Sequence, residues 1–331
     1  MWNLLKDLDR HAVIMRGTRR VAVVMPAHNE ECNIKDAIVS IPQWVDLLVV
    51  INDGSTDDTE LIAKSVMPKF GIILTTDGLG VGGAISLGYD EIIDQIDNKK
   101  VPPGDWVAVV MAGDGQMDPE DIDSLLEPIS RVPFVKGDRW AHSDGLGNMP
   151  NNRRIGSWIL GKLTTLASGR KVSDPQCGYT AVSVSALREW DWVSKWHGYG
   201  YPNWWMLNIG SDSIPFESVP VRSVYRNEKS GIRVPKFLSR VSLLLFSGLW
   251  KRGWNWYVRG EGNTPISSRL VVSSSWFLSI LLLLTIPFLI SIQPGISWML
   301  IVVAGFLATT YQLDQLEVKR RLNHESGPVR I

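Results

Sequence analysis

Three apolar runs of the sequence each end in a short group of polar residues that could bind a ligand. The runs lie in the stretches VVMPAHNEE, DLLVVINDGSTDDT and VAVVMAGDGQMDPED. The polar residues that follow them are Asn29 and Glu30, Asp53, and Asp114 and Gln116. In an open α/β sheet, ligands bind beyond the carboxyl ends of the strands. Three such groups in succession therefore predict one shared binding site, although each group alone is a weak signal.

Each group also has an ordinary structural interpretation. Asn29 and Glu30 suit a helix N-cap followed by a first-turn acid, and Asp53 suits a turn ahead of a capped helix. Asp114 could cap the helix that the stretch PEDIDSLL predicts. Asp118 fits that cap better, because it directly precedes a proline, which is favoured at the first helical position.

The segments that carry these groups alternate between strands and helices from about residue 21 to residue 223. Short β-rich runs closed by turn residues predict strands at VAVVMP, DLLVVIND, GIILTT, WVAVVMAGD and PFVKGD. The segments EECNIKDAIVSI, TDDTELIAKSV and VGGAISLGYDEIIDQI place apolar residues three and four apart, as amphipathic helices do. This alternation predicts an α/β fold with a mostly parallel sheet and helices on both faces.

The last third of the chain has a different character. Residues 235–260 mix Leu, Phe and Trp with Lys and Arg, which fits interfacial helices at a membrane or, equally, a core helix with a basic face. No charged residue occurs from Val271 to Leu313. Because a spanning helix needs about 20 apolar residues, we predict two transmembrane helices over 271–292 and 296–313, joined by a QPG turn. A buried hairpin in a soluble core is the alternative.

Basic residues flank this hairpin on one side. Those that precede or follow it are Lys251, Arg252, Arg259, Arg269, Lys319, Arg320 and Arg321. The connecting turn carries no Lys or Arg. The positive-inside rule therefore predicts that both chain ends and the α/β domain are cytoplasmic. No signal peptide is predicted, because arginines interrupt the apolar residues near the start.

Composition excludes some classes of function. The 331 residues include 34 basic and 34 acidic ones, and a formal net charge of zero argues against a general nucleic-acid binder. The two cysteines, Cys32 and Cys177, do not form a disulfide framework, which favours a reducing compartment. Cys177 is expected to pack as a small residue. His28 and His197 are isolated histidines, which more often pack or form hydrogen bonds than catalyse.

Together the motifs resemble the family 2 glycosyltransferases with the GT-A fold, and most of all the dolichyl- or polyprenyl-phosphate sugar synthases. The matching stretches are VVMPAHNEECNI, INDGSTDDT, GLGVGGAISLGY, MAGDGQMDPED, VKGDRW, NNRRIGSWILGKL and SDPQCGYTAV. The resemblance covers about residues 20–230. It implies an inverting, membrane-bound enzyme that moves a sugar from a GDP- or UDP-linked donor to a polyprenyl or dolichyl phosphate at the cytoplasmic leaflet. A different glycan or lipid acceptor is the alternative.

The resemblance also implies a divalent cation, Mg²⁺ or Mn²⁺, that bridges the protein and the donor diphosphate. Family members carry an Asp-x-Asp motif at this position. Asp114 matches its second Asp, and Gln116 matches a downstream amide that can add an oxygen ligand. Ala112 stands where the first Asp is expected. Phosphate oxygens would then supply more of the metal shell, which Mg²⁺ tolerates because it takes few protein carboxylates.

The other site residues are assigned by the same resemblance. The expected donor-binding residues are Pro26, Ala27, Asn29, Glu30, Asp53, Gly80 and Asp114. Asp53 is expected to accept a hydrogen bond from the base. Arg139 is expected to face the donor diphosphate or the acceptor phosphate, and Asp174 to lie near the acceptor. We therefore predict that Asp114, Arg139 and Asp174 are the catalytic residues.

The acceptor phosphate is expected to meet a basic loop in the stretch NNRRIGSWILGK. Arg153 and Arg154 in this loop could grip the phosphate in bidentate fashion, or they could form a solvated basic turn. In the later stretch VPVRSVYRNEKSGI, the expected phosphate contacts are Arg226, Lys229 and Ser230.

A rival interpretation rests on GLGVGG, residues 78–83, which matches the dinucleotide-binding fingerprint. By itself this motif predicts a nicotinamide enzyme. It follows the third predicted strand instead of the first, however, and a soluble oxidoreductase has no use for a membrane hairpin. A non-catalytic membrane scaffold is a third class, which the intact set of Asp53, Asp114, Arg139 and Asp174 disfavours.

The predicted organisation has four parts. They are a GT-A domain at 1–230, interfacial helices at 231–268, two transmembrane helices at 269–314 and a cytoplasmic tail at 315–331. The expected partners are a nucleotide sugar, a polyprenyl or dolichyl phosphate and the lipid bilayer, without nucleic acid. A homo-oligomer is left open.

Overall fold

A single sheet forms the centre of the computed structural model, which describes residues 19–144, 146, 149, 151–224, 234–261, 264–292 and 298–325. Within these residues the strand order is β3-β2-β1-β4-β6-β5-β7. The strands are β1 (Arg20–Ala27), β2 (Leu47–Asp53), β3 (Gly71–Thr76), β4 (Trp106–Val110), β5 (Phe134–Asp138), β6 (Thr180–Ser183) and β7 (Phe216–Pro220). The five strands predicted from the sequence are β1 to β5.

Strand β6 runs against the direction of its neighbours. It pairs antiparallel with β4 and with β5, whereas the other neighbouring strands of the described sheet pair in parallel. The sheet is therefore mostly parallel, as predicted. The carboxyl ends of β1, β2, β4 and β5 consequently meet at one edge, where the polar groups of the sequence are found.

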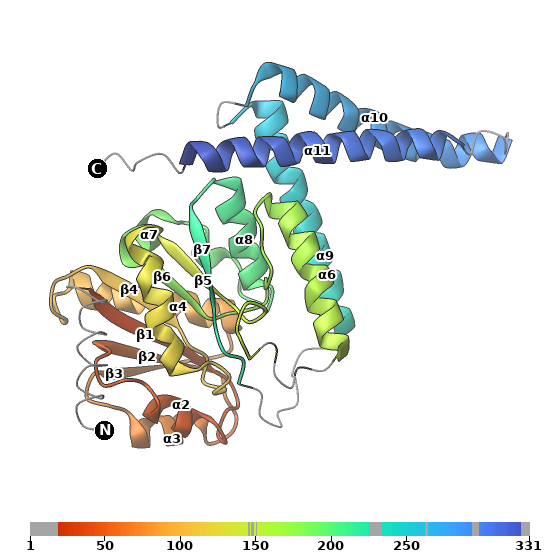
Figure 1. Cartoon of the computed structure of the whole chain (residues 1–331). Helices are drawn as coiled ribbons and strands as arrows, with labels where there is room; N and C mark the ends of the chain where they lie inside the picture. The colour runs from red at the N-terminus through yellow and green to blue at the C-terminus, as the bar shows by residue number, and fades with distance from the viewer. Residues whose placement is uncertain are drawn as a thin grey trace.

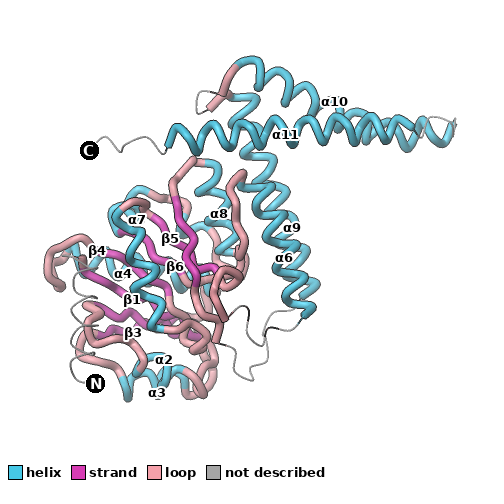
Figure 2. The backbone as a smooth tube through the Cα atoms, viewed as in Figure 1, coloured by secondary structure: helices cyan, strands magenta, loops and turns pink. Residues whose placement is uncertain are grey.

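Helices cover both faces of the sheet (Figures 1 and 2). The α-helices are α2 (Ile34–Val39), α3 (Thr59–Val66), α4 (Val81–Asp97), α5 (Ile122–Leu126), α6 (Asn151–Ser168), α7 (Val184–Glu189), α8 (Tyr201–Ser211), α9 (Val234–Gly253), α10 (Ile266–Ile292) and α11 (Met299–Glu325). Shorter turns of helix are η1 (Pro119–Asp121), η2 (Glu127–Ser130), η3 (Val193–Lys195) and the π-helix η4 (Trp254–Arg259).

The two faces of the sheet bury separate hydrophobic cores. Alternate residues of a strand point to opposite faces, so Val23 and Met25 of β1 pack with α2, α3 and α5. Ala22 and Val24 of the same strand pack with α4, α7 and α8. This period-two burial explains why strands β1, β2 and β4 are apolar along most of their length.

The stretch NNRRIGSWILGK is the start of helix α6, so its prediction as a loop was wrong. The apolar residues that follow the arginines recur three and four positions apart, which is the spacing of one helix face. Helix α6 lies beside α9 (Figure 1), and Leu160 and Ala167 pack there against Val241, Leu244 and Leu245. Arg154 therefore lies on the first turn of a helix.

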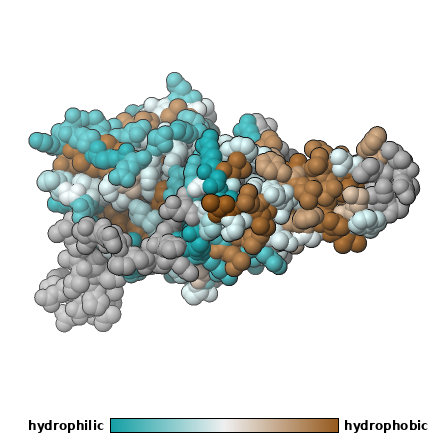
Figure 3. Space-filling view, turned by 90° about the horizontal axis from the view of Figure 1, so that it is seen from above, coloured by the Kyte–Doolittle hydropathy of each residue, from teal (hydrophilic) through white to brown (hydrophobic). Residues whose placement is uncertain are grey.

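Helices α10 and α11 form an antiparallel hairpin whose far end projects away from the α/β domain (Figure 1). Both contain stretches long and apolar enough to cross a membrane, Ile266–Ile286 and Met299–Arg321. Only 22% and 17% of their most apolar windows are buried, unlike the core helices of a soluble protein. From above, apolar side chains gather over this end of the molecule (Figure 3).

The predicted end of the second apolar helix at residue 313 was wrong, because α11 continues to Glu325. Its first charged residue, Asp314, is buried in an ion pair with Arg252 of α9. Arg320 and Arg321 pair with Glu317 one turn away. These charges are thus paired within the protein, with Asp314, Glu317 and Arg321 buried, and they do not end the helix.

Arg252 links the hairpin to the α/β domain. Its Nη1 and Nη2 donate to both carboxylate oxygens of Asp314 at 2.8 and 2.9 Å, and its Nε donates to the Ala167 carbonyl oxygen of α6 at 3.1 Å. The side chain is 2% exposed. A residue that was counted as a flanking cation therefore joins the C-terminal end of α6, helix α9 and helix α11.

Candidate active site

The end of β4 is held against the end of β1. The Gly113 N–H donates to the Pro26 carbonyl oxygen at 3.0 Å. A Cβ atom on Gly113 would lie 2.9 Å from Ile34 Cδ1 and 3.0 Å from Ala27 Cβ. A larger residue would push Ile34 and Ala27 away, so glycine favours this close approach, which brings Asp114 beside the predicted donor-binding residues Pro26 and Ala27.

Asp114 opens a tight turn. Its Oδ1 accepts the Gln116 N–H at 3.0 Å, and Gly115 between them has a positive φ of 69°. Asp118 caps η1 by accepting the Glu120 N–H at 3.0 Å, which confirms that Asp118, and not Asp114, is the cap. The turn sets one carboxylate and one amide two residues apart at the strand edge.

The donor set of this turn fits a cation that shares its shell with a ligand. Among the described residues, no three His, Cys, Asp or Glu side chains gather into a ready-made metal cage. A carboxylate and an amide oxygen from Asp114 and Gln116 leave most of an octahedral shell for phosphate oxygens and water, as Mg²⁺ prefers. The residues present thus fit a metal that binds together with a diphosphate.

Asn29 and Glu30 connect the β1 end to the loop after β2. The Asn29 Oδ1 accepts the Thr56 N–H at 2.8 Å, and the Glu30 N–H donates to Thr59 Oγ1 at 2.7 Å. Neither residue caps α2, whose N-cap is Asn33. Asn29 has a positive φ of 56°, which places its exposed side chain over the neighbouring loop.

Asp53 fixes the loop that follows β3. Its Oδ1 accepts from Thr76 Oγ1 at 2.7 Å and from the Leu79 N–H at 2.6 Å, while Oδ2 accepts from the Gly80 N–H at 2.8 Å. The carboxylate therefore shapes the wall that Gly80 would present to a nucleotide. Because Oδ2 accepts from Gly80 at one of its lone pairs, it has capacity for a second donor, such as a base N–H.

The backbone at Trp196 and His197 packs directly on two glycines of GLGVGG and leaves no room for a side chain there. A Cβ atom on Gly82 would lie 2.1 Å from the Trp196 carbonyl oxygen, and one on Gly80 would lie 2.5 Å from that of His197. The Gly82 N–H donates to the His197 carbonyl oxygen at 2.9 Å. The Trp196–His197 backbone therefore covers the N-terminus of α4. A dinucleotide enzyme would bind the pyrophosphate at this position, so the packing argues against the nicotinamide interpretation.

Arg139 and Asp174 form a bidentate ion pair behind the strand edge. Arg139 Nε and Nη2 donate to Asp174 Oδ2 and Oδ1 at 2.7 and 2.9 Å, and the Arg139 N–H adds a third bond at 3.2 Å. The Asp174 side chain is fully buried. Burial alone raises the pKa of this carboxyl group, but the charge and hydrogen bonds of Arg139 outweigh it and leave the pKa below its ordinary value.

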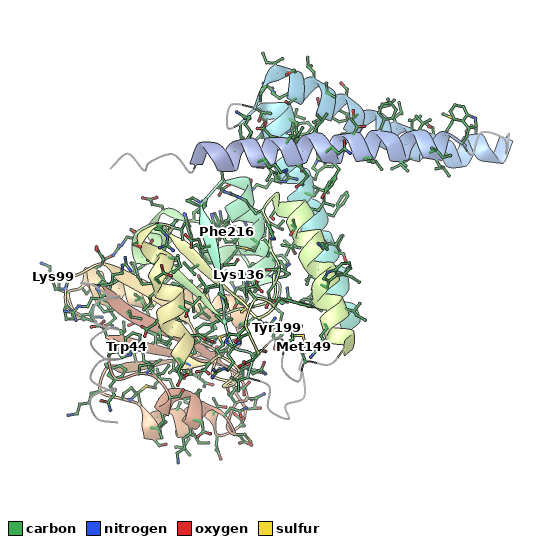
Figure 4. All side chains as sticks on the ribbon, viewed as in Figure 1. Trp44, Lys99, Lys136, Met149, Tyr199 and Phe216 are labelled. Atoms are coloured by element: carbon green, nitrogen blue, oxygen red, sulfur yellow. The ribbon has the colours of Figure 1, made fainter. Side chains whose placement is uncertain are left out.

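The sequence analysis did not identify two charged neighbours of this pair on β5. Lys136, labelled in Figure 4, is buried and donates to the Cys177 carbonyl oxygen, and burial lowers its pKa. Asp138 accepts from the Ser173 hydroxyl and from the Trp140 N–H. Charged residues within the buried strand PFVKGD were the available signal, because a strand interior rarely holds them.

Tyr201 was also missed. It begins α8, and its hydroxyl is directed at the Gly178 carbonyl oxygen. Burial, followed by the charges of Cys177 and Asp114, raises the pKa of this phenol, so it stays protonated as a hydrogen-bond donor. Cys177 itself is buried and the pKa of its thiol is raised, which fits a packed residue and not a nucleophile.

The predicted acceptor residues are described only in part. Arg154 donates from Nε to the Met149 carbonyl oxygen at 2.9 Å on the first turn of α6. The side chain of Arg153, and all of Arg226, Lys229 and Ser230, lie outside the described residues.

The chain that leads toward the later basic group is tied to the Asp114 turn. The Val224 N–H donates to the Gln116 carbonyl oxygen at 3.2 Å, and Arg222 pairs with Asp118 at 2.8 Å. The strand edge therefore combines a carboxylate–amide turn with arginines from two other segments, an arrangement suited to a ligand with phosphate groups.

Comparison with known proteins supports this interpretation of the edge. Residues 22–191, more than half of the chain, match the family described as Glycosyl transferase family 2. The chain is 26% identical over 223 residues to the UDP-N-acetylglucosamine–dolichyl-phosphate N-acetylglucosaminyltransferase of Methanococcus voltae, covering 62% of this chain and 86% of that protein. It is 28% identical over 189 residues to the undecaprenyl-phosphate mannosyltransferase of Micrococcus luteus, covering 55% and 74%.

A solved structure shares the fold. Glucosyl-3-phosphoglycerate synthase from Mycobacterium tuberculosis, in complex with Mn²⁺, UDP and phosphoglyceric acid, aligns with a TM-score of 0.52 at 20% identity, covering 73% of this chain and 81% of the other. The similarity agrees with the GT-A fold inferred from the motifs. With its strand-edge site and its match over residues 22–191, the chain belongs to glycosyltransferase family 2.

Proposed function

We propose that this enzyme transfers a sugar, with inversion, from a GDP- or UDP-linked donor to a polyprenyl or dolichyl phosphate at the cytoplasmic leaflet of a membrane. The two curated relatives named above support the acceptor class, because their names give dolichyl or undecaprenyl phosphate as acceptor. The M. tuberculosis synthase, described with UDP and with Mn²⁺, supports a nucleotide donor and a divalent cation.

Helix α6 is the observation that carries the proposal. Its first turn holds Arg154 shortly after the end of β5, and its last turn contacts Arg252 at the base of the hairpin. One helix thus runs from Arg154, a proposed contact of the acceptor phosphate, to the base of the candidate membrane spans. A soluble acceptor would need no such connection, whereas an acceptor whose phosphate is attached to a lipid must be met at the bilayer surface.

The donor would lie across the ends of β1, β2 and β4. Asp53 holds the Leu79–Gly80 loop as one wall, and the Asp114 turn forms another. Asp114 and Gln116 would hold the cation with the diphosphate oxygens, where it would neutralise charge on the departing nucleoside diphosphate. The Ala112 position leaves Asp114 as the only motif carboxylate for this role.

Arg139 would stabilise the same developing charge, and Asp174 would act through it. A guanidinium held at two points by a buried carboxylate is already oriented before the substrate binds, which is the arrangement that electrostatic catalysis requires. Both Asp174 oxygens accept from Arg139, and the pKa of Asp174 is lowered. We therefore assign Asp174 as a positioning residue and not as a general base.

The acceptor needs no general base. A phosphate monoester is ionised at neutral pH, since its second pKa is about 6. Its oxygen would attack the anomeric carbon as the bond from that carbon to the donor diphosphate breaks, which inverts the configuration. Arg153 and Arg154 on α6, with Arg226, Lys229 and Ser230, are the proposed contacts of the acceptor phosphate.

Helices α6 and α9 are proposed to lie in the membrane interface. Their exposed large apolar residues include Ile155, Trp158 and Ile159 on α6 and Leu243 and Phe246 on α9. The Lys162 Nζ lies 5.8 Å from the centre of the Trp158 ring. A basic side chain beside an aromatic one suits the head-group region of a membrane. With α10 and α11 spanning the bilayer, the proposed divisions remain 1–230, 231–268, 269–314 and 315–331, with α6 added to the interfacial part.

Product analysis tests the proposal. Purified enzyme is incubated with a panel of UDP- and GDP-sugars and with a polyprenyl phosphate, the matching polyprenol or a soluble saccharide, with and without EDTA. We expect mass spectrometry to detect one glycosyl polyprenyl phosphate. NMR should show that the configuration at its anomeric carbon is inverted relative to the donor, and EDTA should abolish its formation. Equal glycosylation of the polyprenol or the saccharide would show that the acceptor is wrong.

A further inference from the structure

A cavity of about 220 Å³ lies where the hairpin meets the α/β domain. Its walls include Leu166 of α6, Leu249 of α9, Tyr257 of η4, Val272 and Trp276 of α10, and Leu307 of α11. Apolar cavities of about 150 Å³ stay dry and take up small apolar molecules. The cavity is therefore large enough for a segment of hydrocarbon chain.

The polar groups at the floor of this cavity are occupied by one another. Arg252 donates to both oxygens of Asp314 and to the Leu166 and Ala167 carbonyl oxygens. The Tyr257 hydroxyl donates to Asp314 Oδ1 at 2.7 Å. A head group entering here would have to break these bonds, whereas a hydrocarbon chain would only fill apolar space. The lining therefore selects a chain and not a phosphate.

An exposed apolar stripe on α6 leads to this cavity. Its residues are Ile155, Trp158, Ile159 and Leu163. They recur three and four positions apart, so they lie on one face of the helix. The stripe begins next to Arg154 and ends next to Leu166, which lie about 18 Å apart along the axis at 1.5 Å per residue. This length corresponds to several isoprene units.

We propose that the polyprenyl chain of the acceptor lies along this stripe and ends in the cavity at the base of the hairpin. The inference rests on the proposed function and deepens it. The path has a basic residue at one end and hydrocarbon-binding surface along the rest, which matches a long chain with a single phosphate head. A bilayer phospholipid shares the chain chemistry, but nothing requires its head group to sit at Arg154.

Chain-length kinetics test this path. For the native enzyme we expect the KM for the acceptor to fall as isoprene units are added, until the chain reaches the cavity, and then to stay constant. Leu249→Trp and Leu307→Trp fill the cavity from two different helices. Each is expected to raise the KM for long-chain acceptors about 10-fold, which corresponds to about 1.4 kcal/mol, with kcat and the KM for the shortest acceptor unchanged.

Leu284→Trp is the matched control, because Leu284 of α10 is 74% exposed and does not line the cavity. It should behave like the native enzyme at every chain length. A KM that is independent of chain length, or equal effects of the cavity-filling and control variants, would overturn the proposal. Nucleotide-sugar binding by each variant verifies that the α/β domain is folded.

Photolabelling of the native enzyme distinguishes the polyprenyl chain of the acceptor from the acyl chain of a bilayer phospholipid. Native enzyme is labelled with polyprenyl phosphate that carries a diazirine at its chain end, or with a phospholipid that carries one on an acyl chain. Val272 is 1% exposed, so its labelling reports entry into the cavity. We expect the polyprenyl probe to label it, with competition by unlabelled polyprenyl phosphate. Equal labelling by the phospholipid probe without such competition would assign the cavity to bilayer lipid.

The outcome is separable from that of the proposed function. If no polyprenyl phosphate is glycosylated at any chain length, the proposed function fails. If all chain lengths are glycosylated with the same KM and Val272 is not labelled, only the chain path fails.

Discussion

The proposed donor side of this molecule, at the ends of β1 and β2, and its proposed acceptor side, from the end of β5 through α6 to the hairpin, hold their polar residues in different ways. On the donor side, side chains at the ends of β1 and β2 bind the backbone of neighbouring loops, as Asp53 does with Leu79 and Gly80 and as Asn29 does with Thr56. These bonds fix the shape of surface loops. Asp53 is buried, but its partners are a hydroxyl and backbone N–H groups and not an oppositely charged side chain.

On the acceptor side, charged side chains pair with one another inside the protein. Arg139 makes a bidentate pair with Asp174, whose side chain is fully buried, and Arg252 makes a bidentate pair with Asp314 in which both side chains are nearly excluded from solvent. Removing one member of such a pair leaves an uncompensated buried charge, which is far more destabilising than losing a surface contact.

The difference predicts how substitutions divide between the two sides. A donor-side change should loosen a loop and weaken nucleotide-sugar binding, with a smaller effect on folding because it leaves no opposite charge unpaired. An acceptor-side change within a buried pair should lower both stability and turnover. The Asp114 turn, which would hold the cation, should be the most sensitive position for the reaction itself.

Asp114→Asn is expected to have the largest effect. The substitution removes the only motif carboxylate available to the cation, so turnover should fall by about two orders of magnitude or more. Steady-state kinetics against Mn²⁺ or Mg²⁺ concentration measures it. Asp94→Asn is the control, since Asp94 pairs with Lys100 on the surface at the C-terminal end of α4, and its turnover should stay near normal. Near-normal, metal-dependent turnover by Asp114→Asn would remove Asp114 from the site.

Asp174→Asn is expected to have the next largest effect. Breaking the buried pair should lower the free energy of unfolding by about 3 kcal/mol and reduce kcat by about 10- to 100-fold through misplacement of Arg139. Asp97→Asn, which breaks the exposed pair with Arg188, should change little in both assays.

The pH profile separates the positioning role of Asp174 from a base role. Because its pKa is lowered, the carboxylate stays ionised well below neutral pH. The kcat profile of Asp174→Asn should therefore keep the shape of the native profile at a lower level. Disappearance of an acidic limb from the profile in the variant would show that Asp174 acts as a base.

Asp53→Asn tests the donor side. The amide nitrogen cannot accept the loop N–H groups, and hydrogen bonds to a charged group contribute about 1.5–3 kcal/mol. We expect the KM for the nucleotide sugar to rise about 10-fold, which corresponds to about 1.4 kcal/mol, with the KM for the lipid unchanged. A large loss of thermal stability, equal to that of Asp174→Asn, would contradict the contrast between the two sides.

Arg154→Ala should give the smallest effect. Arg154 is half-buried on the first turn of α6, and the variant is expected to raise the KM for the lipid phosphate a few-fold and leave that for the nucleotide sugar unchanged. Arg131→Ala is the control, because Arg131 pairs with Glu127 and Glu217 on the surface. If both variants shift the lipid KM equally, the effect is one of net charge and not of a contact at α6.

Sequence patterns that depend on residues close together in the chain predicted the strands and helices of the proposed donor side well. Strands β1 to β5 and helices α2 to α4 follow from alternation and three-to-four spacing, and Asp118 was recognised as a cap from the proline after it. The β4 end was identified as a site because Gly113 and Asp114 interrupt an apolar run. The functional roles of these residues remain predictions.

Features that depend on distant contacts were not predictable from such patterns. Strand β6 has four residues, and its antiparallel position between β4 and β5 is set by tertiary pairing. The buried Lys136 is satisfied by a carbonyl oxygen 41 residues away, that of Cys177, which accepts its hydrogen bond. The basic motif that begins α6 was interpreted as a phosphate-binding loop, although its apolar spacing was helical.

The Arg252 junction has a consequence for the membrane in which the enzyme works. Because this one side chain connects α6, α9 and α11, these helices should move as a single rigid body. A transmembrane hairpin tilts to match the hydrocarbon thickness of its bilayer. If α10 and α11 span the membrane as proposed, such a tilt would rotate α6 with them and lift or lower the Arg154 end relative to the head groups. Bilayer thickness would thereby regulate how readily the acceptor phosphate reaches the strand edge.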